Sequence, residues 1–337
     1  MNTVTAQATT SPRLAALRHE DVLTGYRGVR TIVLGASGFI GQWVVRYLHA
    51  LDAEVYPLMR DAGRAPALFP AEELRARTIA ADVLDLAALR THMTAAGPAI
   101  IFNLAGYGVD PTERDPFLAE HINARLPAML CDWLTGWDAP GWSGQRLIHV
   151  GSAAEYGAAA GDLREDTPAR PTTLYGRTKL AGTQQVLECC AARQLRGLTA
   201  RLFTVYGPGE HAGRLLPSLL ACARTGEPLP LTAGLQQRDF TYVEDVAEGL
   251  LRLGLVHAAP GEVANLATGH LTAVRTFIET AAEILRIPAD RLQFGALPAR
   301  PDEMQHNPVN VTTLYARTGW RPDTGIYEGI RNTVALT

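Results

Sequence analysis

From Val29 onward, short apolar runs alternate with longer segments whose apolar residues recur at helical spacing. The runs that we expect to form buried strands are residues 31–34, 55–59, 99–104, 147–150 and 197–203. The segments between them that are long enough for helices are residues 39–51, 85–95, 111–134 and 172–193. This alternation predicts an α/β fold built on a doubly wound parallel sheet, with a ligand crevice at the carboxyl ends of the strands.

The pattern changes after about Tyr206, where glycine and proline become frequent and the elements become shorter. This change predicts a smaller, loop-rich domain. Residues 239–253 again have the pattern of a strand followed by a helix, so we expect the chain to return to the first domain. We therefore expect a poorly ordered extension (1–28), a dinucleotide-binding domain (29–207 plus about 238–268) and an interleaved C-terminal domain for the substrate (about 208–237 plus 269–337).

Composition narrows the possible partners. The formal net charge of −3 and the pI near 6.3 provide no basic field for nucleic acid or anionic lipid, so we expect a small-molecule partner bound in a cleft. We expect no membrane span, because no run of eighteen apolar residues occurs, and no secretory signal, because the first residues lack an apolar stretch. We expect a cytoplasmic protein.

The four cysteines do not form a recognisable ligand or disulfide pattern. Cys131, Cys189, Cys190 and Cys222 show neither C-x-x-C spacing nor a histidine at ligand spacing. We interpret them as buried or incidental thiols in a reducing compartment, and we expect no metal site.

A glycine-rich segment lies directly between the first predicted strand and the first predicted helix. It reads Gly35-Ala36-Ser37-Gly38-Phe39-Ile40-Gly41, which has the spacing G-x-x-G-x-x-G. Glycines here permit a tight turn and let the backbone approach a pyrophosphate at the helix N-terminus. No Gly-Lys-Ser/Thr follows, so a P-loop is disfavoured. The segment predicts a Rossmann-like dinucleotide site, and a turn that serves only packing is the alternative.

The tip of the second strand indicates which nicotinamide cofactor fits. An acid at this position binds the adenosine ribose of NAD, whereas an arginine accepts the 2′-phosphate of NADP. The strand ends in Leu58-Met59-Arg60-Asp61, with Arg60 where the acid is expected. We therefore favour NADP(H), and NAD stays open because Asp61 is adjacent and Arg60 can be an ordinary surface residue.

Tyr175 and Lys179 are four residues apart at the start of a helical pattern, so they share one face of the helix. A nearby ammonium stabilises a phenolate, which leads us to expect a lowered pKa for Tyr175 and a role in proton transfer. This spacing also occurs by chance on exposed helices, so the pair alone does not identify an active site.

Further segments, in a fixed order, make the chain resemble the extended short-chain dehydrogenase/reductase family of nucleoside-diphosphate-sugar (NDP-sugar) enzymes. The resemblance covers about Thr31 to Pro322. It is carried by Gly35, Gly38, Gly41, Asp82, Asn103-Leu104-Ala105-Gly106, residues 150–157 (VGSAAEYG), Tyr175 with Lys179, residues 201–209 (RLFTVYGPG) and residues 238–246 (RDFTYVEDV).

The resemblance implies a role for each matching residue. Ser152 would bind the reacting sugar oxygen, Tyr175 would be the general acid/base, and Lys179 would hold the nicotinamide ribose. The cofactor would also contact Asp82, Val83, Leu104, Ala105 and Gly106. The substrate would contact Thr204, where the family usually has Asn, and Arg238 and Arg300 would bind its diphosphate. The family also usually forms homodimers, here through the predicted helices 111–134 and 172–193.

Three functions remain open, and the residues after Ser152 disfavour a fourth, a 4,6-dehydratase. Dehydratases of the family have an acid directly after the catalytic Ser or Thr, whereas this chain has Ala153 and Ala154. We favour an NADPH-dependent reductase of a 4-keto sugar nucleotide because of Arg60. An NAD-dependent epimerase is the alternative, and an inactive nucleotide-binding protein is disfavoured because Tyr175 and Lys179 are both present.

Overall fold

A parallel sheet forms the centre of the larger domain. The computed structural model describes residue 13 and residues 21–110, 112–257, 260–299 and 305–337. Within these residues the sheet has seven strands in the order β11-β6-β5-β4-β1-β2-β3. The strands are β1 (Arg30–Leu34), β2 (Glu54–Met59), β3 (Ile79–Ala80), β4 (Ile100–Asn103), β5 (Leu147–Ser152), β6 (Gly197–Leu202) and β11 (Glu262–Leu266). The strand order reverses between β1 and β4, which confirms the predicted Rossmann-like α/β fold.

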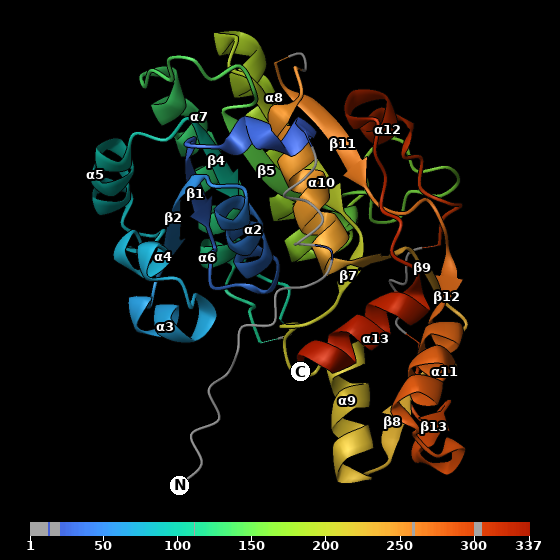
Figure 1. Cartoon of the computed structure of the whole chain (residues 1–337). Coiled ribbons are helices and arrows are strands. Elements are labelled where there is room, and N and C mark those ends of the chain that lie inside the picture. Colours follow the sequence, from blue (N-terminus) through green and yellow to red (C-terminus); the bar gives the residue numbers. More distant parts are fainter. Residues whose placement is uncertain (1–12, 14–20, 111, 258–259, 300–304) are drawn as a thin grey trace, which may run out of the picture.

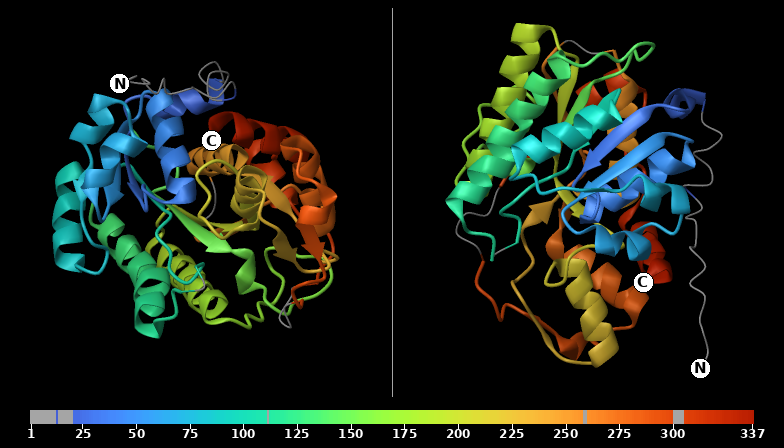
Figure 2. Two further views of the ribbon diagram at one scale, coloured as in Figure 1. Left: turned by 90° about the horizontal axis from the view of Figure 1, so that it is seen from below. Right: turned by 90° about the vertical axis from the view of Figure 1, so that its left-hand side faces the viewer.

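Helices cover both faces of this sheet (Figure 1, Figure 2). One face carries α2 (Phe39–Ala50) and α10 (Val243–Leu255), and the other carries α5 (Leu86–Ala96), α7 (Leu126–Thr135) and α8 (Leu174–Arg193). Val33 packs into the core on the α2 side, whereas its neighbours Ile32 and Leu34 pack into the core on the α8 side. Burial on both faces is why β1 is a continuous apolar run. The short elements η2 (Ala62–Arg64), α3 (Ala65–Leu68) and α4 (Glu72–Ala76) connect β2 to β3.

Most of the smaller domain packs below the sheet in Figure 1, whereas α12 (Thr312–Thr318) lies beside β11. Its other elements are α9 (Leu215–Thr225), β8 (Leu229–Leu231), β9 (Gln237–Arg238), β12 (Thr272–Ala273), α11 (Val274–Leu285), η5 (Ala289–Arg291), β13 (Leu292–Phe294) and α13 (Ile326–Leu336). At the junction, β7 (Thr204–Tyr206) pairs with β10 (Phe240–Tyr242). The rings of Phe240 and Phe277 stack with centroids 4.3 Å apart, so the apolar core is continuous between the domains.

The chain crosses between the domains more than once. After β10 it forms α10 on the large sheet, and β11 then pairs with β6 before the chain continues into β12 and α11. A return to the larger domain within residues 238–268 was expected from the sequence. The domain boundaries themselves stay predictions.

The expected single helix over 111–134 is wrong. Helix α6 begins at Pro116 and ends at Glu120, and a π-helical turn, η3 (His121–Arg125), separates it from α7. The carboxylate of Asp115 accepts hydrogen bonds from the Phe117 and Leu118 amides and so fixes the start of α6.

Part of the N-terminal segment is ordered, contrary to the expectation for residues 1–28. A 3-10 helix, η1 (Asp21–Tyr26), buries Leu23 and Tyr26 completely, and the Tyr26 hydroxyl donates to the Leu251 carbonyl at 2.7 Å. Arg13 also contacts α10: its guanidinium lies 2.6 Å from the carboxylate of Asp245 and 2.9 Å from that of Glu248. Residues 1–12 and 14–20 lie outside the described residues.

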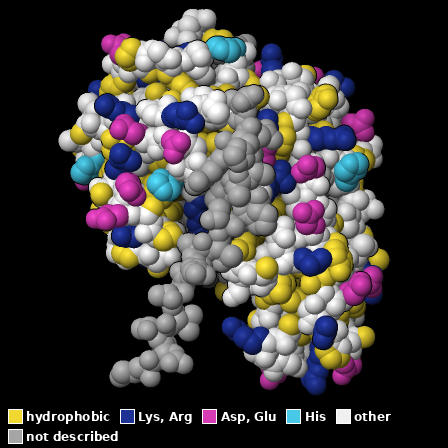
Figure 3. All heavy atoms as spheres, in the orientation of Figure 1, with side chains coloured by type: hydrophobic (Ala, Val, Ile, Leu, Met, Phe, Trp, Pro, Cys, Tyr) yellow, Lys and Arg dark blue, Asp and Glu magenta, His cyan; other side chains and the backbone are white. Residues whose placement is uncertain are grey.

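The face of the molecule in Figure 3 carries basic and acidic side chains mixed together. No helix in the described part of the chain combines the length and the apolar character needed to cross a membrane.

We predict that Arg13→Ala lowers the free energy of unfolding by about 1 to 3 kcal/mol, because it removes the cation that lies against the buried carboxylates of Asp245 and Glu248. Asp245 is completely buried and Glu248 almost so, and burial already raises the pKa of Asp245 to about 6. Urea unfolding followed by circular dichroism measures the effect.

The matched control for this prediction is Arg164→Ala, because Arg164 forms an exposed pair with Asp166 and should change stability by less than about 0.5 kcal/mol. Equal stability of the two variants would show that the ion pairs of Arg13 stabilise the fold no more than an exposed pair does.

Candidate active site

The turn between β1 and α2 is too tight for side chains. Gly35 has φ +74°, and a Cβ placed on it would lie 3.0 Å from the backbone of Leu104 and Ala105. A Cβ on Gly41 would lie only 2.1 Å from the Gly35 carbonyl oxygen. Gly38 caps α2 without a side-chain hydrogen bond, so the first amides of this helix point toward the crevice. These residues therefore fit a pyrophosphate that approaches the backbone at the helix N-terminus.

The predicted cofactor residues after β4 lie beside this turn, at the point where the strand order reverses. Leu104 and Ala105 are half-buried next to Gly35, and Gly106 is exposed. The side chain of Asn103 accepts a hydrogen bond from the Ala105 amide at 3.3 Å and so shapes the loop. Within α2 and its turn, Ser37, Phe39 and Ile40 are half-buried. The structure thus brings together the segments that the sequence assigned to the dinucleotide.

The next two strand ends present one cation and two carboxylates. Arg60 is exposed directly after β2, whereas the Asp61 carboxylate accepts a hydrogen bond from the Gly63 amide at 2.9 Å and caps η2. Asp82 is exposed after β3, with its carboxylate accepting from the Leu84 amide, and Val83 is half-buried beside it. Asp61 is therefore used in a local turn while Arg60 extends toward solvent.

Ser152 ends β5 and begins a 3-10 turn, η4 (Ala153–Glu155). Its hydroxyl accepts a hydrogen bond from the Ala154 amide at 3.2 Å, and its own amide donates to Glu155 Oε1 at 2.8 Å. This reciprocal capping box fixes the Ser152 side chain at the strand end. The hydroxyl also forms a hydrogen bond with the Tyr175 phenol.

Tyr175 lies in the first turn of α8, whose N-cap Thr173 accepts a hydrogen bond from the Gly176 amide. The expected fall in the pKa of Tyr175 is wrong for this structure. Burial raises the pKa to about 12, and the hydrogen bond with Ser152 offsets this only in part. The phenol is therefore protonated at neutral pH.

Lys179, one turn further along α8, is buried, and its Nζ donates to the Val150 carbonyl at 2.6 Å. Burial lowers the pKa of Lys179 to about 8, against the opposing charge of Glu155. The pair that the sequence placed on one helix face thus meets Ser152 at the end of β5.

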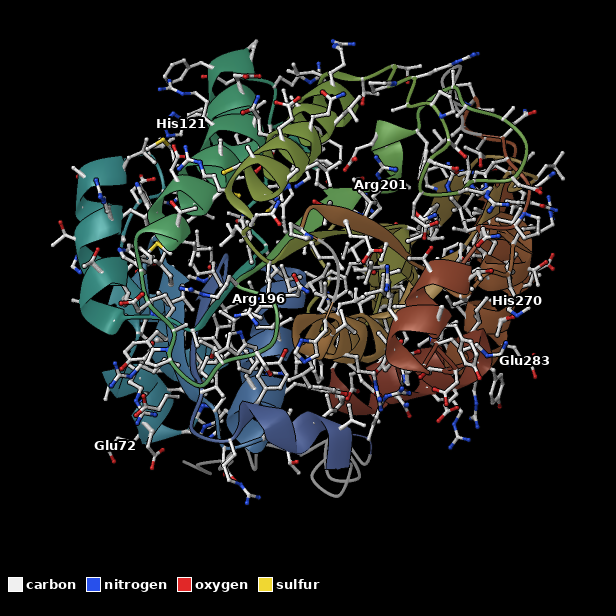
Figure 4. The ribbon with its side chains drawn as sticks, turned by 90° about the horizontal axis from the view of Figure 1, so that it is seen from above. Glu72, His121, Arg196, Arg201, His270 and Glu283 are labelled. Carbon is white, nitrogen blue, oxygen red and sulfur yellow. The ribbon has the colours of Figure 1, made fainter. Side chains whose placement is uncertain are left out.

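A buried ion pair beneath Ser152 was not predicted. Arg201 on β6 (labelled in Figure 4) donates from Nε to Glu155 Oε2 at 2.8 Å, and its guanidinium stacks 4.6 Å above the Tyr156 ring. Glu155 is completely buried. Both residues lie in segments that carry the resemblance, but only burial shows that they act on each other.

Asn123, in the π-helical turn η3, was also missed. Its Nδ2 donates to the Tyr107 carbonyl at 2.8 Å and to Thr178 Oγ1 at 2.9 Å, and its Oδ1 accepts from the Tyr107 amide. One side chain therefore ties the loop after β4 to α8, next to Tyr175 and Lys179. No signal in the sequence indicated this role, because it depends on the wide turn.

The predicted substrate residues lie toward the smaller domain. Thr204 is half-buried in β7, and its amide donates to the Asp239 carbonyl at 3.0 Å. Arg238 is half-buried in β9, and its guanidinium donates to the Gln237 carbonyl. Arg300 lies outside the described residues, so the convergence of Arg238 and Arg300 on one diphosphate stays a prediction. Among the described residues, no cluster of three or more His, Cys, Asp or Glu side chains is arranged to hold a metal ion.

The fold is that of a dinucleotide-dependent enzyme, and a serine, a tyrosine and a lysine lie together at the end of β5. Residues 31–267 match the model of the NAD dependent epimerase/dehydratase family. The chain belongs to this family, as the resemblance in its sequence implied, and it is an NAD(P)-dependent enzyme of the extended short-chain dehydrogenase/reductase type.

Individual relatives cover nearly the whole chain. It is 30% identical over 315 residues to a dTDP-6-deoxy-L-talose 4-dehydrogenase (NAD(P)+) of Kitasatospora kifunensis. The matched region covers 90% of this chain and 93% of the relative. It is 29% identical to a UDP-glucose 4-epimerase of Mycolicibacterium smegmatis, and the matched region covers 91% of this chain and 97% of the epimerase. The solved structure of MoeE5 in complex with UDP-glucuronic acid and NAD superposes with a TM-score of 0.77 at 27% identity. The superposition covers 91% of this chain and 98% of MoeE5.

We predict that kcat/KM falls as the pH rises through about 8, because Lys179 then loses its proton. The pH profile of kcat/KM reports groups of the free enzyme, and the pKa of Tyr175 near 12 lies above this range. Lys179→Arg keeps a cation at all accessible pH values and should move the fall upward, although with lower activity. An unchanged profile in this variant would assign the fall to another group.

Proposed function

We propose that this protein reduces the 4-keto group of a nucleoside-diphosphate hexose with NADPH, as an NDP-hexose 4-ketoreductase. NADPH, when bound, supplies the hydride to the carbonyl carbon. Ser152 donates a hydrogen bond to the carbonyl oxygen, and Tyr175 transfers its proton to that oxygen as the negative charge develops. The products are the 4-hydroxy sugar nucleotide and NADP+, and Tyr175 regains a proton from solvent.

The observation that carries this proposal is the contact between the Ser152 hydroxyl and a protonated Tyr175 phenol. Reduction requires the phenol as an acid, and burial raises its pKa to about 12, which maintains that form at neutral pH. Oxidation of a sugar hydroxyl would require the phenolate as a base. The local environment of Tyr175 therefore supplies the protonated form that reduction uses.

The surroundings of Ser152 argue against water elimination. Ala153 and Ala154 follow it, and the next carboxylate, Glu155, has one oxygen bonded to the Ser152 amide and the other to Arg201. A completely buried carboxylate with both oxygens in use is not available to remove a proton from the substrate. The site is equipped for proton transfer coupled to hydride transfer.

The preference for NADPH rests on the end of β2. The exposed guanidinium of Arg60 suits a 2′-phosphate, and the Asp61 carboxylate is engaged with the Gly63 amide rather than directed at a ribose. The K. kifunensis relative is named for use of both NAD and NADP. Its name also states oxidation at the 4-position of a deoxysugar nucleotide, and the reverse of that reaction is the one proposed here.

An epimerase is the second candidate, supported by the similarity to the mycobacterial UDP-glucose 4-epimerase. In that case one bound NAD would oxidise C4 and return the hydride to the opposite face. Nucleotide that copurifies with the protein distinguishes the two: tightly held NAD supports the epimerase, whereas a reductase exchanges its cofactor at each turnover.

We further propose that the substrate diphosphate lies near Arg238, which is half-buried in β9.

We also propose that the protein is a homodimer. A hollow between η3–α7 and α8 is lined by Glu120, Ala124, Arg125, Ala128, Met129, Ala181 and Gln185. Phe117, on α6 beside it, exposes 67% of its surface. Small residues and an exposed aromatic ring on these helices are suited to a second copy of the same helices.

We predict that the protein oxidises NADPH in the presence of a dTDP- or GDP-4-keto-6-deoxyhexose, and that Tyr175→Phe lowers kcat by a factor on the order of 100 to 10,000. Tyr315→Phe is the matched control, because Tyr315 is exposed on α12 and should leave turnover unchanged. Absorbance at the NADPH band measures both variants. Turnover of Tyr175→Phe within a few-fold of the parent would exclude the proposed proton donor.

We predict that Arg60→Ala weakens the binding of NADPH by about 10- to 100-fold and leaves that of NADH nearly unchanged, since only NADPH offers a phosphate to the guanidinium. Fluorescence titration with each cofactor measures this difference, with the exposed Arg224→Ala in the smaller domain as the control. Equal losses for both cofactors would show that Arg60 does not select NADP.

A further inference from the structure

Asp239 connects three segments at the junction between the two domains. It lies between β9 and β10 and is almost completely buried. Its carbonyl accepts a hydrogen bond from the Thr204 amide at 3.0 Å, which extends the pairing of β7 with β10. Its carboxylate bonds to Thr268 and Gly269 in the loop after β11. One residue therefore joins the start of β7, the β9–β10 segment and the loop after β11.

The carboxylate of Asp239 accepts four hydrogen bonds. Oδ1 accepts from the Thr268 amide and the Thr268 hydroxyl, both at 2.9 Å, and from the Thr241 hydroxyl at 3.3 Å. Oδ2 accepts from the Gly269 amide at 2.8 Å. All four partners are donors, as an ionised carboxylate requires, and they oppose the rise in the pKa of Asp239 that burial causes. The loop after β11 is therefore fixed to the β9–β10 segment through this side chain.

Arg238, the residue proposed to lie near the substrate diphosphate, directly precedes this anchor. Its backbone pairs with Thr272 of β12 (Figure 1), and the loop that Asp239 fixes is the one that leads from β11 to β12. That loop continues through His270 (labelled in Figure 4), whose amide donates to the Thr268 hydroxyl at 3.1 Å. Successive side chains of an extended chain point to opposite faces, so the inward Asp239 carboxylate directs the Arg238 guanidinium to the other face.

We propose that Asp239 is a positioning residue for the substrate, which holds the Arg238 guanidinium where it binds a nucleoside diphosphate. In this role Asp239 acts through Arg238 and not by its own contact with substrate. A guanidinium whose backbone is fixed beforehand loses less freedom when the ligand binds. The inference rests on the proposed place of the diphosphate near Arg238, but not on the direction of the reaction, since a reductase and an epimerase both bind this group.

The test is the affinity of the protein for UDP, dTDP and GDP, which contain the diphosphate but no sugar that could react. Isothermal titration calorimetry measures the dissociation constant of the nucleotide that binds most tightly. We expect Arg238→Ala to weaken its binding by about 10- to 100-fold, because charge-assisted hydrogen bonds are lost. We expect Asp239→Asn to weaken it by about 5- to 10-fold, because either orientation of the new amide places an N–H group against a backbone N–H group.

The double variant Arg238→Ala/Asp239→Asn separates positioning from a general effect on folding. Its loss of affinity should equal that of Arg238→Ala alone, because a residue that acts through Arg238 has no effect once the guanidinium is gone. The same comparison of KM and kcat, with a sugar nucleotide that the protein turns over, should show the loss in KM.

Thr268→Val gives an answer even where Asp239→Asn fails to fold, because it removes one of the four hydrogen bonds and keeps the backbone amides. We expect about two- to fivefold weaker nucleotide binding, again with no further loss when it is combined with Arg238→Ala. Thr333→Val is the matched control. It removes a buried hydroxyl that donates to the Gly329 carbonyl at 2.7 Å within α13, and it should leave nucleotide binding unchanged.

Three results would overturn the proposal. Losses that multiply in the double variants would show that Asp239 affects binding by a route other than Arg238. Parent-like affinity of folded Asp239→Asn and Thr268→Val proteins, with weak binding by Arg238→Ala, would show that Arg238 keeps its position without the anchor. Equal affinity of the parent and Arg238→Ala, including no binding by either, would refute the diphosphate site and this inference together. Failure to oxidise NADPH with any keto-sugar nucleotide would count against the proposed reductase alone.

Discussion

The buried ion pair between Glu155 and Arg201 is the interaction on which the rest of the site depends. It joins the end of β5 to β6, and through the Glu155 carboxylate it fixes the Ser152 amide. Arg201 also donates to the Glu165 carbonyl, and Glu165 in turn accepts from the Asn265 amide on β11. Removing one member would leave an uncompensated charge in the interior, so the ends of β5 and β6 and the position of Ser152 are stabilised together.

The remaining parts of the site depend on close backbone approach. Glycines at 35 and 41 let α2 meet β1 and the loop after β4, and Gly182 lets α8 approach η3, where a Cβ would lie 1.9 Å from the Asn123 carbonyl oxygen. These contacts bring the start of α2 to the loop after β4, and α8 to η3. The close approaches are therefore made between the backbones of helices, strands and the loop after β4, where any side chain larger than hydrogen would intervene.

Much of this arrangement could be predicted from the sequence, because the signals are local. Apolar runs identified the strands, and the glycine spacing marked the tight turn between β1 and α2 where the structure has it. What sequence reasoning missed depends on burial. The direction of the Tyr175 pKa, the partner of Glu155 and the contacts of Asn123 all follow from which side chains lose water when distant segments pack. The placement of Arg300 stays a prediction.

The position of β11 at the edge of the large sheet has a consequence for synthesis on the ribosome. Its partner β6 ends at residue 202, yet β11 begins only at residue 262, after most of the smaller domain's first half has been made. Until then β6 presents an unpaired, apolar edge, which is a template for aggregation. The larger domain therefore cannot finish folding until β11 has also left the exit tunnel. A chain that stalls before that point would depend on chaperones for its solubility.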